Sequence, residues 1–94
     1  MVKRFRLKAK VSSDNINAIR PVLKAHLPKT HIKTDGRDLL IEADLEGSDV
    51  KELNRILLSA LRKAEKRTRL RSEWTSEGGI TYYFFDYVLK RTEK

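Results

Sequence analysis

The chain has 94 residues and a mass of 11.0 kDa, which is the size of one domain. It contains no cysteine, which excludes disulfide scaffolds, thiolate zinc sites and thiol catalysis. Lys and Arg number 21 against 13 Asp and Glu, so the net charge is +8. A small protein this basic most often binds an acidic partner such as nucleic acid, although a charge-rich thermophile surface would also explain the excess.

The sequence shows no signal for a membrane or for export. No apolar run approaches the ~18 residues of a membrane span, and the basic N-terminus lacks the apolar segment of a secretory signal. We therefore expect a cytoplasmic protein with no membrane attachment. Charged residues make up 36% of the chain and there is one methionine, a usage typical of thermophile proteins and archaeal in style.

The first quarter of the chain predicts a strand followed by a helix. Residues 2–11 alternate between apolar and basic side chains, which is typical of a strand with one buried face. Residues 12–14 (Ser-Ser-Asp) are candidate N-caps for the helix. Pro21 lies inside the helical pattern, so we expect either a kink there or a helix that starts at about residue 20, and we expect Pro28 to end it.

A β-hairpin is predicted over residues 30–46. A short strand over 30–34 precedes the Asp35-Gly36 pair, which is a strong hairpin signal because the turn residues need positive φ. Residues 38–46 then alternate again, with apolar side chains on one face and acidic side chains on the other.

The next segment predicts one long amphipathic helix, from a cap at Ser48 or Asp49 to about Arg67. Residues 51–71 hold eight basic and two acidic side chains. The cations near the end of this helix are Arg62, Lys63, Lys66, Arg67, Arg69 and Arg71. Two or three would suit the negative end of the helix dipole, and the surplus favours contacts with phosphates. We therefore predict that these six side chains bind RNA.

For the C-terminal part, residues 71–79 are expected to form a connection. Residues 80–90, rich in aromatic and β-branched side chains, predict the last strand, and residues 91–94 a frayed tail. An alternative places a strand at 68–75 and pairs it with residues 80–88 across Glu77-Gly78-Gly79.

The order β-α-β-β-α-β predicts a single α+β domain of the ferredoxin-like type, with an antiparallel sheet in the order 4-1-3-2 and both helices on one face. The first and third strands are then neighbours. Their solvent-side rows are Arg4, Arg6, Lys8 and Lys10 against Glu42, Asp44 and Glu46. Each pair of opposite charges across these strands would stabilise the sheet by about 0.2–1 kcal/mol.

The predicted last strand is apolar on both faces, and only one face fits under the helices. One face carries Tyr82, Phe84 and Val88, and the other carries Tyr83, Phe85, Tyr87 and Leu89. A free aromatic face could stack bases beside the basic row of the first strand. RNA-recognition sheets, however, carry their aromatics on the first and third strands with a Gly-Phe-rich signature that this chain lacks. We therefore expect Tyr82, Phe84 and Val88 to form a protein interface.

Catalysis has little support in the sequence. The two histidines, His26 and His31, belong to no catalytic or metal-binding motif, and there is no glycine-rich phosphate loop. The acidic residues between 35 and 49 lack the spacing of a calcium loop. We expect no enzymatic activity, no metal site and no cofactor.

Residues Leu39–Lys63, LLIEADLEGSDVKELNRILLSALRK, resemble the small dimerising subunit of the KEOPS complex. In that family an alternating strand ends in an acidic pair, and a capped helix follows with the pattern Leu-x-x-x-Leu/Ile-x-Ser-x-Leu. The matching residues here are Leu53, Leu57, Ser59 and Leu61. The resemblance covers roughly residues 3–66.

The resemblance implies a non-catalytic accessory subunit in the threonylcarbamoyl-adenosine modification of tRNA. Such a subunit pairs through its sheet with an identical or paralogous copy and docks its helices on the catalytic subunit. The helix positions that would serve this docking are Leu53, Ile56, Leu57 and Ala60. The basic helix end and the extra aromatic strand depart from the family pattern and favour a divergent paralogue whose basic helix end contacts tRNA. The other hypotheses are a stand-alone RNA-binding or ribosome-associated protein and a structural dimerisation module.

Overall fold

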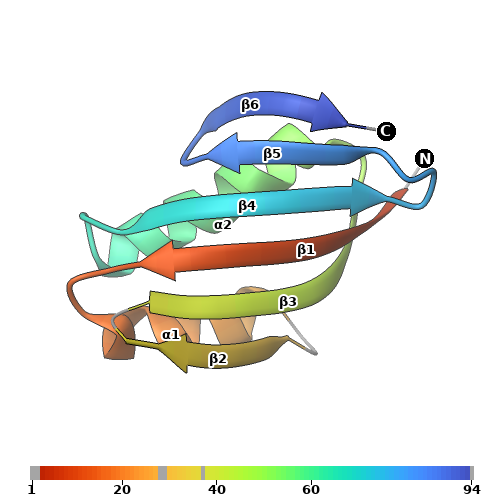
Figure 1. Ribbon diagram of the computed structural model, residues 1–94. Coiled ribbons are helices and arrows are strands. Elements are labelled where there is room, and N and C mark those ends of the chain that lie inside the picture. The colour runs from red at the N-terminus through yellow and green to blue at the C-terminus, as the bar shows by residue number, and fades with distance from the viewer. Residues whose placement is uncertain (1–2, 28–29, 37, 94) are drawn as a thin grey trace.

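The computed structural model describes residues 3–27, 30–36 and 38–93. These residues form one sheet of six strands, and two helices cover one of its faces (Figure 1). In chain order the elements are β1 (Lys3–Ser12), α1 (Ile16–His26), β2 (His31–Asp35), β3 (Asp38–Gly47), α2 (Val50–Ala64), β4 (Arg69–Ser76), β5 (Thr81–Phe85) and β6 (Val88–Glu93). The predicted α+β class is confirmed, and the first six elements follow the predicted β-α-β-β-α-β order.

The strands lie in the order β2-β3-β1-β4-β5-β6, and every neighbouring pair is antiparallel. β1, β2 and β3 lie in the predicted order, but the strand on the other side of β1 is residues 69–76 instead of the predicted 80–90. β5 and β6 extend the sheet beyond β4, on the side away from β2 (Figure 1). The predicted pairing of the first and third strands is also confirmed, with Arg4 opposite Glu46 and Arg6 opposite Asp44.

The segment expected to be a connection is instead a strand. β4 spans Arg69–Ser76, so the alternative with a strand at 68–75 is the one that the structure shows. One inward side chain of β4 is the buried Ser72. This polar residue interrupts the apolar alternation by which a strand is recognised in a sequence. The tight turn over residues 77–79 joins β4 to β5.

The single strand expected over residues 80–90 is divided in two. A two-residue turn at Asp86-Tyr87 separates β5 from β6, and Asp86 adopts a positive φ of 57°. β6 includes residues 91–93, which were expected to form a frayed tail. The turn also changes which side chains share a face, so the face assignments predicted for this run do not hold beyond Phe85.

Helix α1 begins at Ile16 and is capped by Asn15, whose side chain accepts a hydrogen bond from a first-turn amide at 3.3 Å. The cap expected within residues 12–14 is thus too early. The helix also runs through Pro21 instead of starting near it. Because Pro21 is exposed, water can satisfy the carbonyl that a proline leaves without an amide partner. The expected stop at Pro28 lies outside the described residues.

Helix α2 begins at Val50 after the predicted cap Asp49, which accepts a hydrogen bond from the amide of Lys51 at 3.0 Å. It ends at Ala64 rather than near Arg67. A turn follows at once, closed by the Thr68 hydroxyl, which donates to a backbone carbonyl at the helix end at 2.7 Å. The basic run expected on one helix therefore bends around a corner into β4.

The β2–β3 hairpin is confirmed, with its turn one residue later than the Asp-Gly pair suggests. Asp35 still pairs with Asp38 across the two strands. Gly36, with a φ of 63°, therefore takes the first turn position.

The core lies between the sheet and the two helices. The inward faces of β1 and β3 contribute Phe5, Leu7, Ala9, Val11, Leu39, Ile41 and Ala43, as predicted. The helices add Ile19, Leu23, Val50, Leu57, Leu58 and Leu61, and the C-terminal strands add Leu70, Trp74 and Phe84. Within the part of the chain that the structure describes, neither helix is long and apolar enough to cross a membrane.

A buried polar cluster ties α2 to the C-terminal strands. The Asn54 side-chain oxygen accepts hydrogen bonds from the Ser72 hydroxyl at 2.6 Å and from the Trp74 indole at 3.2 Å. Its amide group donates to the Asp86 carbonyl at 2.7 Å. The Asp86 carboxylate accepts a hydrogen bond from the Leu70 amide at 3.0 Å, which closes the end of the β5–β6 hairpin onto β4. The hairpin is thus fixed to the rest of the fold.

Candidate nucleic-acid interface

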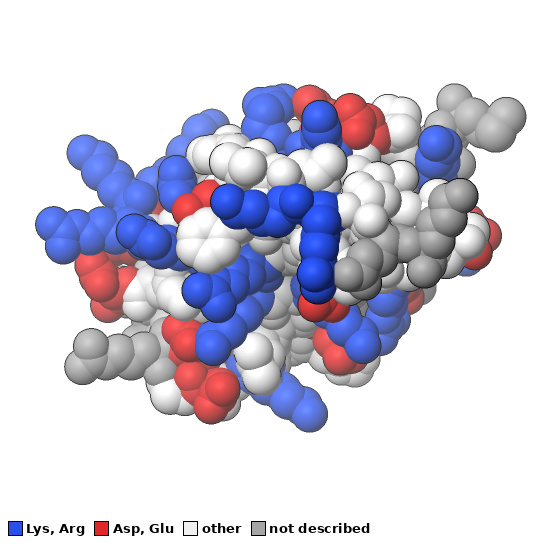
Figure 2. Space-filling view, turned by 45° about the horizontal axis from the view of Figure 1, so that its top comes forward, with Lys and Arg blue, Asp and Glu red and all other residues white. Residues whose placement is uncertain are grey.

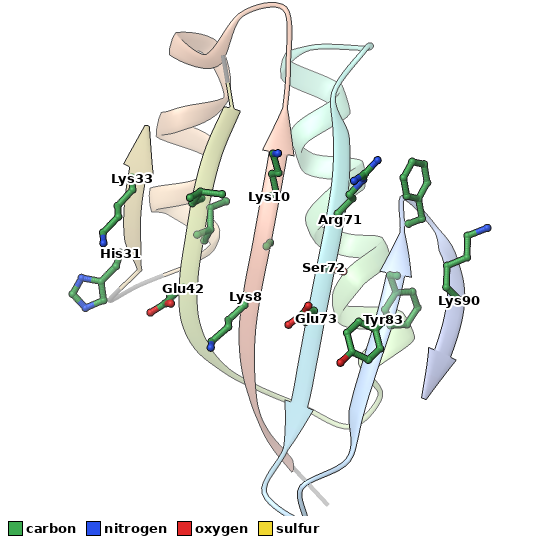
Figure 3. Close-up of a pocket in the computed structure, with 15 residues that line it drawn as sticks. Lys8, Lys10, His31, Lys33, Glu42, Arg71, Ser72, Glu73, Tyr83 and Lys90 are labelled. Carbon is green, nitrogen blue, oxygen red and sulfur yellow. The ribbon is translucent and has the colours of Figure 1, made fainter. Parts of the chain in front are cut away.

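The sheet face opposite the helices is open, and it forms a wide hollow of about 720 Å³. Side chains from all six strands line this hollow, because alternate residues of each strand point away from the helices. Figure 3 shows Lys8 and Lys10 on β1 in the middle, Arg71 and Glu73 on β4 beside them, and Tyr83 further out on β5. The helices lie behind the sheet in this view.

On one part of this face the charges neutralise one another. Arg4 lies 3.4 Å from Glu46, and Arg6 reaches both Asp44 at 3.2 Å and Glu42 at 3.3 Å. These are the predicted cross-strand pairs between β1 and β3. They lie on the surface, so each contributes at most about 1 kcal/mol. This part of the face has little net charge to offer a ligand.

One row of residues across the open face combines cations with apolar side chains. From β2 to β6 the register aligns Lys33, Leu40, Lys10, Arg71, Phe85 and Val88. Lys10 and Arg71 stand directly opposite each other on adjacent strands, an arrangement that destabilises a sheet unless something compensates. The row is therefore a place where an anion would be bound favourably.

Asp38, two residues before Leu40 on β3, compensates part of this charge from the neighbouring row. Its carboxylate lies 3.3 Å from the Lys10 ammonium and accepts a hydrogen bond from the Ser12 hydroxyl at 2.7 Å. The Ser12 hydrogen bond and the positive charges of Lys10 and Arg71 lower the pKa of Asp38. One carboxylate leaves this row basic, since Lys33 and Arg71 form no salt bridge with any described residue.

Two aromatic rings on β5 point to the open face, each with a cation over it. The Arg71 guanidinium lies 4.9 Å from the centre of the Phe85 ring, and the Arg91 guanidinium lies 4.8 Å from that of Tyr83. The Lys90 ammonium lies 6.0 Å from the Phe85 ring. These cation–π contacts hold guanidinium planes and aromatic rings together on one surface.

A β-bulge places the β6 cations beside the rings. Tyr83 pairs with Arg91 and Phe84 pairs with Leu89, so Lys90 is the extra residue on β6. Both Lys90 and Arg91 consequently lie on the side of the rings, where a regular strand would present only one of them. Figure 2, which turns the β6 edge forward, shows Lys and Arg side chains spread around an uncharged area.

The six cations predicted to bind RNA from the helix end do not form one surface. Arg62 is held in place by three contacts within the fold. It donates to the Thr68 carbonyl at 3.0 Å, lies 3.5 Å from the Asp86 carboxylate and covers the Tyr87 ring at 5.2 Å from its centre. Lys63 is exposed on α2, and Lys66 and Arg67 lie on the turn that follows. Only Arg69 and Arg71, on β4, belong to the open face.

The seven residues predicted to contact a partner are also divided. Phe84 and Leu57 are buried in the core and offer no surface, because the face of β5 that carries Phe84 lies under the helices. Tyr82 and Leu53 are half-buried and pack against the same core. Val88 on the open face and Ile56 on α2 are exposed, and the half-buried Ala60 lines a groove beside Ile56.

His26 and His31 are both exposed, and His31 lies at the edge of the open face (Figure 3). Among the described residues, no group of three or more His, Asp or Glu side chains is arranged to hold a metal ion. The open face offers cations, rings and exposed polar groups, which suit binding rather than covalent chemistry.

Base stacking on the aromatic face of β5 was the less favoured alternative to a protein interface in the sequence, and it was expected beside the basic row of β1. The cations over the Tyr83 and Phe85 rings are instead Arg71, Lys90 and Arg91. The residues that sequence reasoning missed are Lys33, Lys90 and Arg91. The alternation of β1 and β2 already indicated that Lys33 faces solvent. Nothing in the sequence pattern indicated the bulge that exposes Lys90 and Arg91.

Comparison of the chain with models of known protein families, with curated proteins and with solved structures gave no match.

Proposed function

We propose that this protein binds RNA through the open face of its sheet. The observation that carries the proposal is the row in which Lys10 and Arg71 stand opposite each other and Phe85 continues the row beneath the Arg71 guanidinium. Phosphates would relieve the repulsion between the two cations, and bases have planar faces that stack on rings and guanidiniums. The resemblance to a tRNA-modification subunit supports RNA as the nucleic acid.

The distribution of charge supports the open face over the helix end. The β1–β3 ion pairs neutralise one part of the sheet, whereas Lys8, Lys33 and Arg71 form no salt bridge with any described residue. At the helix end, Arg62 is held by its contacts to the Asp86 carboxylate. Fewer of the predicted helix-end cations therefore remain for phosphates.

A matched pair of triple variants tests the proposal. Lys8, Arg71 and Lys90 are changed to Gln on the open face, and Lys24, Lys51 and Lys63 are changed to Gln on the helices. Both variants lose the same net charge. Binding of a labelled U10 RNA is measured by anisotropy at several salt concentrations. The open-face variant should bind more weakly and show a slope of log K against log salt that is smaller by about 2, since each single-strand phosphate contact contributes about 0.7.

The helix variant should bind nearly as tightly as the wild type. Equal losses in the two variants would mean that net charge alone drives binding, and a larger loss in the helix variant would return the site to the helices. A dT10 DNA strand is the parallel ligand, and tighter binding of dT10 than of U10 would contradict RNA as the natural partner.

A second proposed function is that of accessory subunit in a tRNA-modification assembly, and one observation favours it. The chain segment that carries the resemblance folds as predicted, and α2 leaves Ile56 44% exposed beside a shallow groove against α1. Ala60 lines the same groove, so docking on a catalytic subunit would use these two residues rather than the buried Leu57. Affinity purification from the native cell, with recovery of the other subunits of such an assembly, tests this function. We place both functions in the cytoplasm.

A further inference from the structure

We propose that Tyr83 and Phe85 are two adjacent stacking subsites for consecutive unpaired bases, so that the ligand of the open face is a single strand rather than a duplex. The inference rests on the proposed function and specifies the form of its ligand. It comes from the spacing of the two rings, the cation beside each and the anchoring of the hairpin that carries them.

The spacing of the rings selects an unstacked strand. Tyr83 and Phe85 are two residues apart on β5 and point to the same side, which separates them by roughly 6.6 Å. Stacked bases in a duplex are about 3.4 Å apart along each strand. Consecutive bases of a duplex therefore cannot occupy both rings, whereas an extended single strand can separate its bases to fit.

Each ring has a cation that can reach the phosphate of a stacked nucleotide. Arg91 lies over Tyr83 at 4.8 Å, and Arg71 lies over Phe85 at 4.9 Å with Lys90 at 6.0 Å. A guanidinium is planar and always charged, so it serves both as a stacking surface and as a bidentate phosphate ligand. The bulge at Lys90 supplies a second cation at this edge of the sheet and thus completes both subsites.

The hairpin is anchored in a way that keeps the subsites in place without a ligand. The Asp86 amide donates to the Leu70 carbonyl at 2.7 Å, and the Asp86 carbonyl accepts from the Asn54 side chain. Inward from the rings, Phe84 is 4% exposed and belongs to the core. Because β5 is fixed on its inner side, the entropy lost when bases stack on its outer side is small.

The test compares aromatic variants on single-stranded and double-stranded RNA. The test variant changes both Tyr83 and Phe85 to Leu. The control is Tyr87→Leu, because Tyr87 is 45% exposed but lies against α2, where its hydroxyl is 3.3 Å from that of Ser59. Ligands are U10 and a ten-base-pair RNA duplex, measured by anisotropy at one fixed salt concentration, and circular dichroism confirms that each variant is folded.

Each ring should contribute a factor of about 5 to 150 in affinity for U10, the fold-change equivalent to about 1–3 kcal/mol per stacked base. The double variant should therefore lose at least about 25-fold on U10 and no more than about 2-fold on the duplex. Tyr87→Leu should leave both affinities within about 2-fold of the wild type. A second measurement uses only the wild-type protein: a ten-nucleotide abasic strand, which keeps the phosphates but lacks the bases, should bind at least about 10-fold more weakly than U10.

The outcomes separate this inference from the proposed function. Unchanged U10 binding in the double variant, or equal binding of U10 and the abasic strand, would overturn the stacking subsites. If the open-face charge variant still weakens binding, the proposed function survives. Equal loss on U10 and on the duplex would also overturn the inference. No binding of U10 by the wild-type protein would refute the proposed function and the subsites together.

Discussion

Replacement of Asn54 by Ala should destabilise the fold strongly, although Asn54 is a polar residue. Asn54 is 1% exposed and holds three groups at once: the Ser72 hydroxyl, the Trp74 indole and the Asp86 carbonyl. In the variant the indole keeps one partner, since it also donates to the Ser72 hydroxyl at 3.1 Å. The Ser72 hydroxyl loses its acceptor and the Asp86 carbonyl loses its side-chain donor.

The magnitude follows from the two groups left without a partner. A buried polar group without a hydrogen bond costs about 1–3 kcal/mol, so the free energy of unfolding should fall by about 2–6 kcal/mol. In a domain of this size each kcal/mol lowers Tm by roughly 4–8 °C, so Tm should fall by at least about 8 °C. The single tryptophan, Trp74, is fully buried in this cluster, so its fluorescence reports unfolding in urea directly.

Asn17→Ala is the matched control, because Asn17 is exposed on α1 and alanine is the better helix former. Its unfolding free energy should equal or slightly exceed that of the wild type. Ser72→Ala should cost less than Asn54→Ala, and the double variant should show coupling of about 1 kcal/mol, because the two side chains share one network. A loss below about 0.5 kcal/mol for Asn54→Ala would refute the view that this cluster anchors the hairpin.

Three further predictions concern the turn, the pH response and the sheet edge. Gly36→Ala should lower the unfolding free energy by about 1–2 kcal/mol, because φ at this position is +63°. The control, Gly78→Ala, should change the unfolding free energy little. Equal effects of the two substitutions in urea unfolding would contradict this prediction. The lowered pKa of Asp38 means that its carboxylate stabilises the fold at neutral pH and that this contribution is lost as pH falls through the folded pKa, so Asp38→Asn should flatten the stability curve in acid; an unchanged slope would argue against it. Antiparallel pairing of two identical β6 edges would bring the like charges of Lys90 and Arg91 of both copies together. Light scattering of the isolated chain should therefore give the monomer mass. A dimer that is lost when β6 is disrupted would contradict this prediction.

The first two-thirds of the fold could be predicted because local pattern and tertiary packing agree there. β1 and β3 alternate between buried and solvent-facing positions, with Leu40 as the apolar exception on the solvent face, and their charged rows oppose each other in the structure as the sequence indicates. The cap at Asp49 was likewise readable. The structure of these segments therefore follows from their local sequence pattern alone.

The C-terminal third could be predicted only as one of two alternatives, because tertiary contacts override its local pattern. β4 buries Ser72, which is stable there only because Asn54 satisfies it, and no rule of periodicity anticipates that pairing. The positive φ of Asp86 is stabilised in the same way by contacts to Leu70 and Asn54. The candidate site shares this origin, since the turn and the bulge decide which aromatic and basic side chains face solvent. The sequence therefore indicated an acidic partner and a set of cations for it, and the structure divides that set between the helix, the turn and β4.

Binding of RNA on the open face of the sheet can be mapped residue by residue from amide chemical shifts. In a titration of isotope-labelled protein with U10, the largest shifts should occur in β1 around Lys8–Lys10, in β4 around Arg71 and in β5 over Tyr83–Phe85. Residues of α1 and of the outer side of α2 should change little. Shifts confined to the helices, or to the turn at Lys66 and Arg67, would mean that RNA does not bind on the open face.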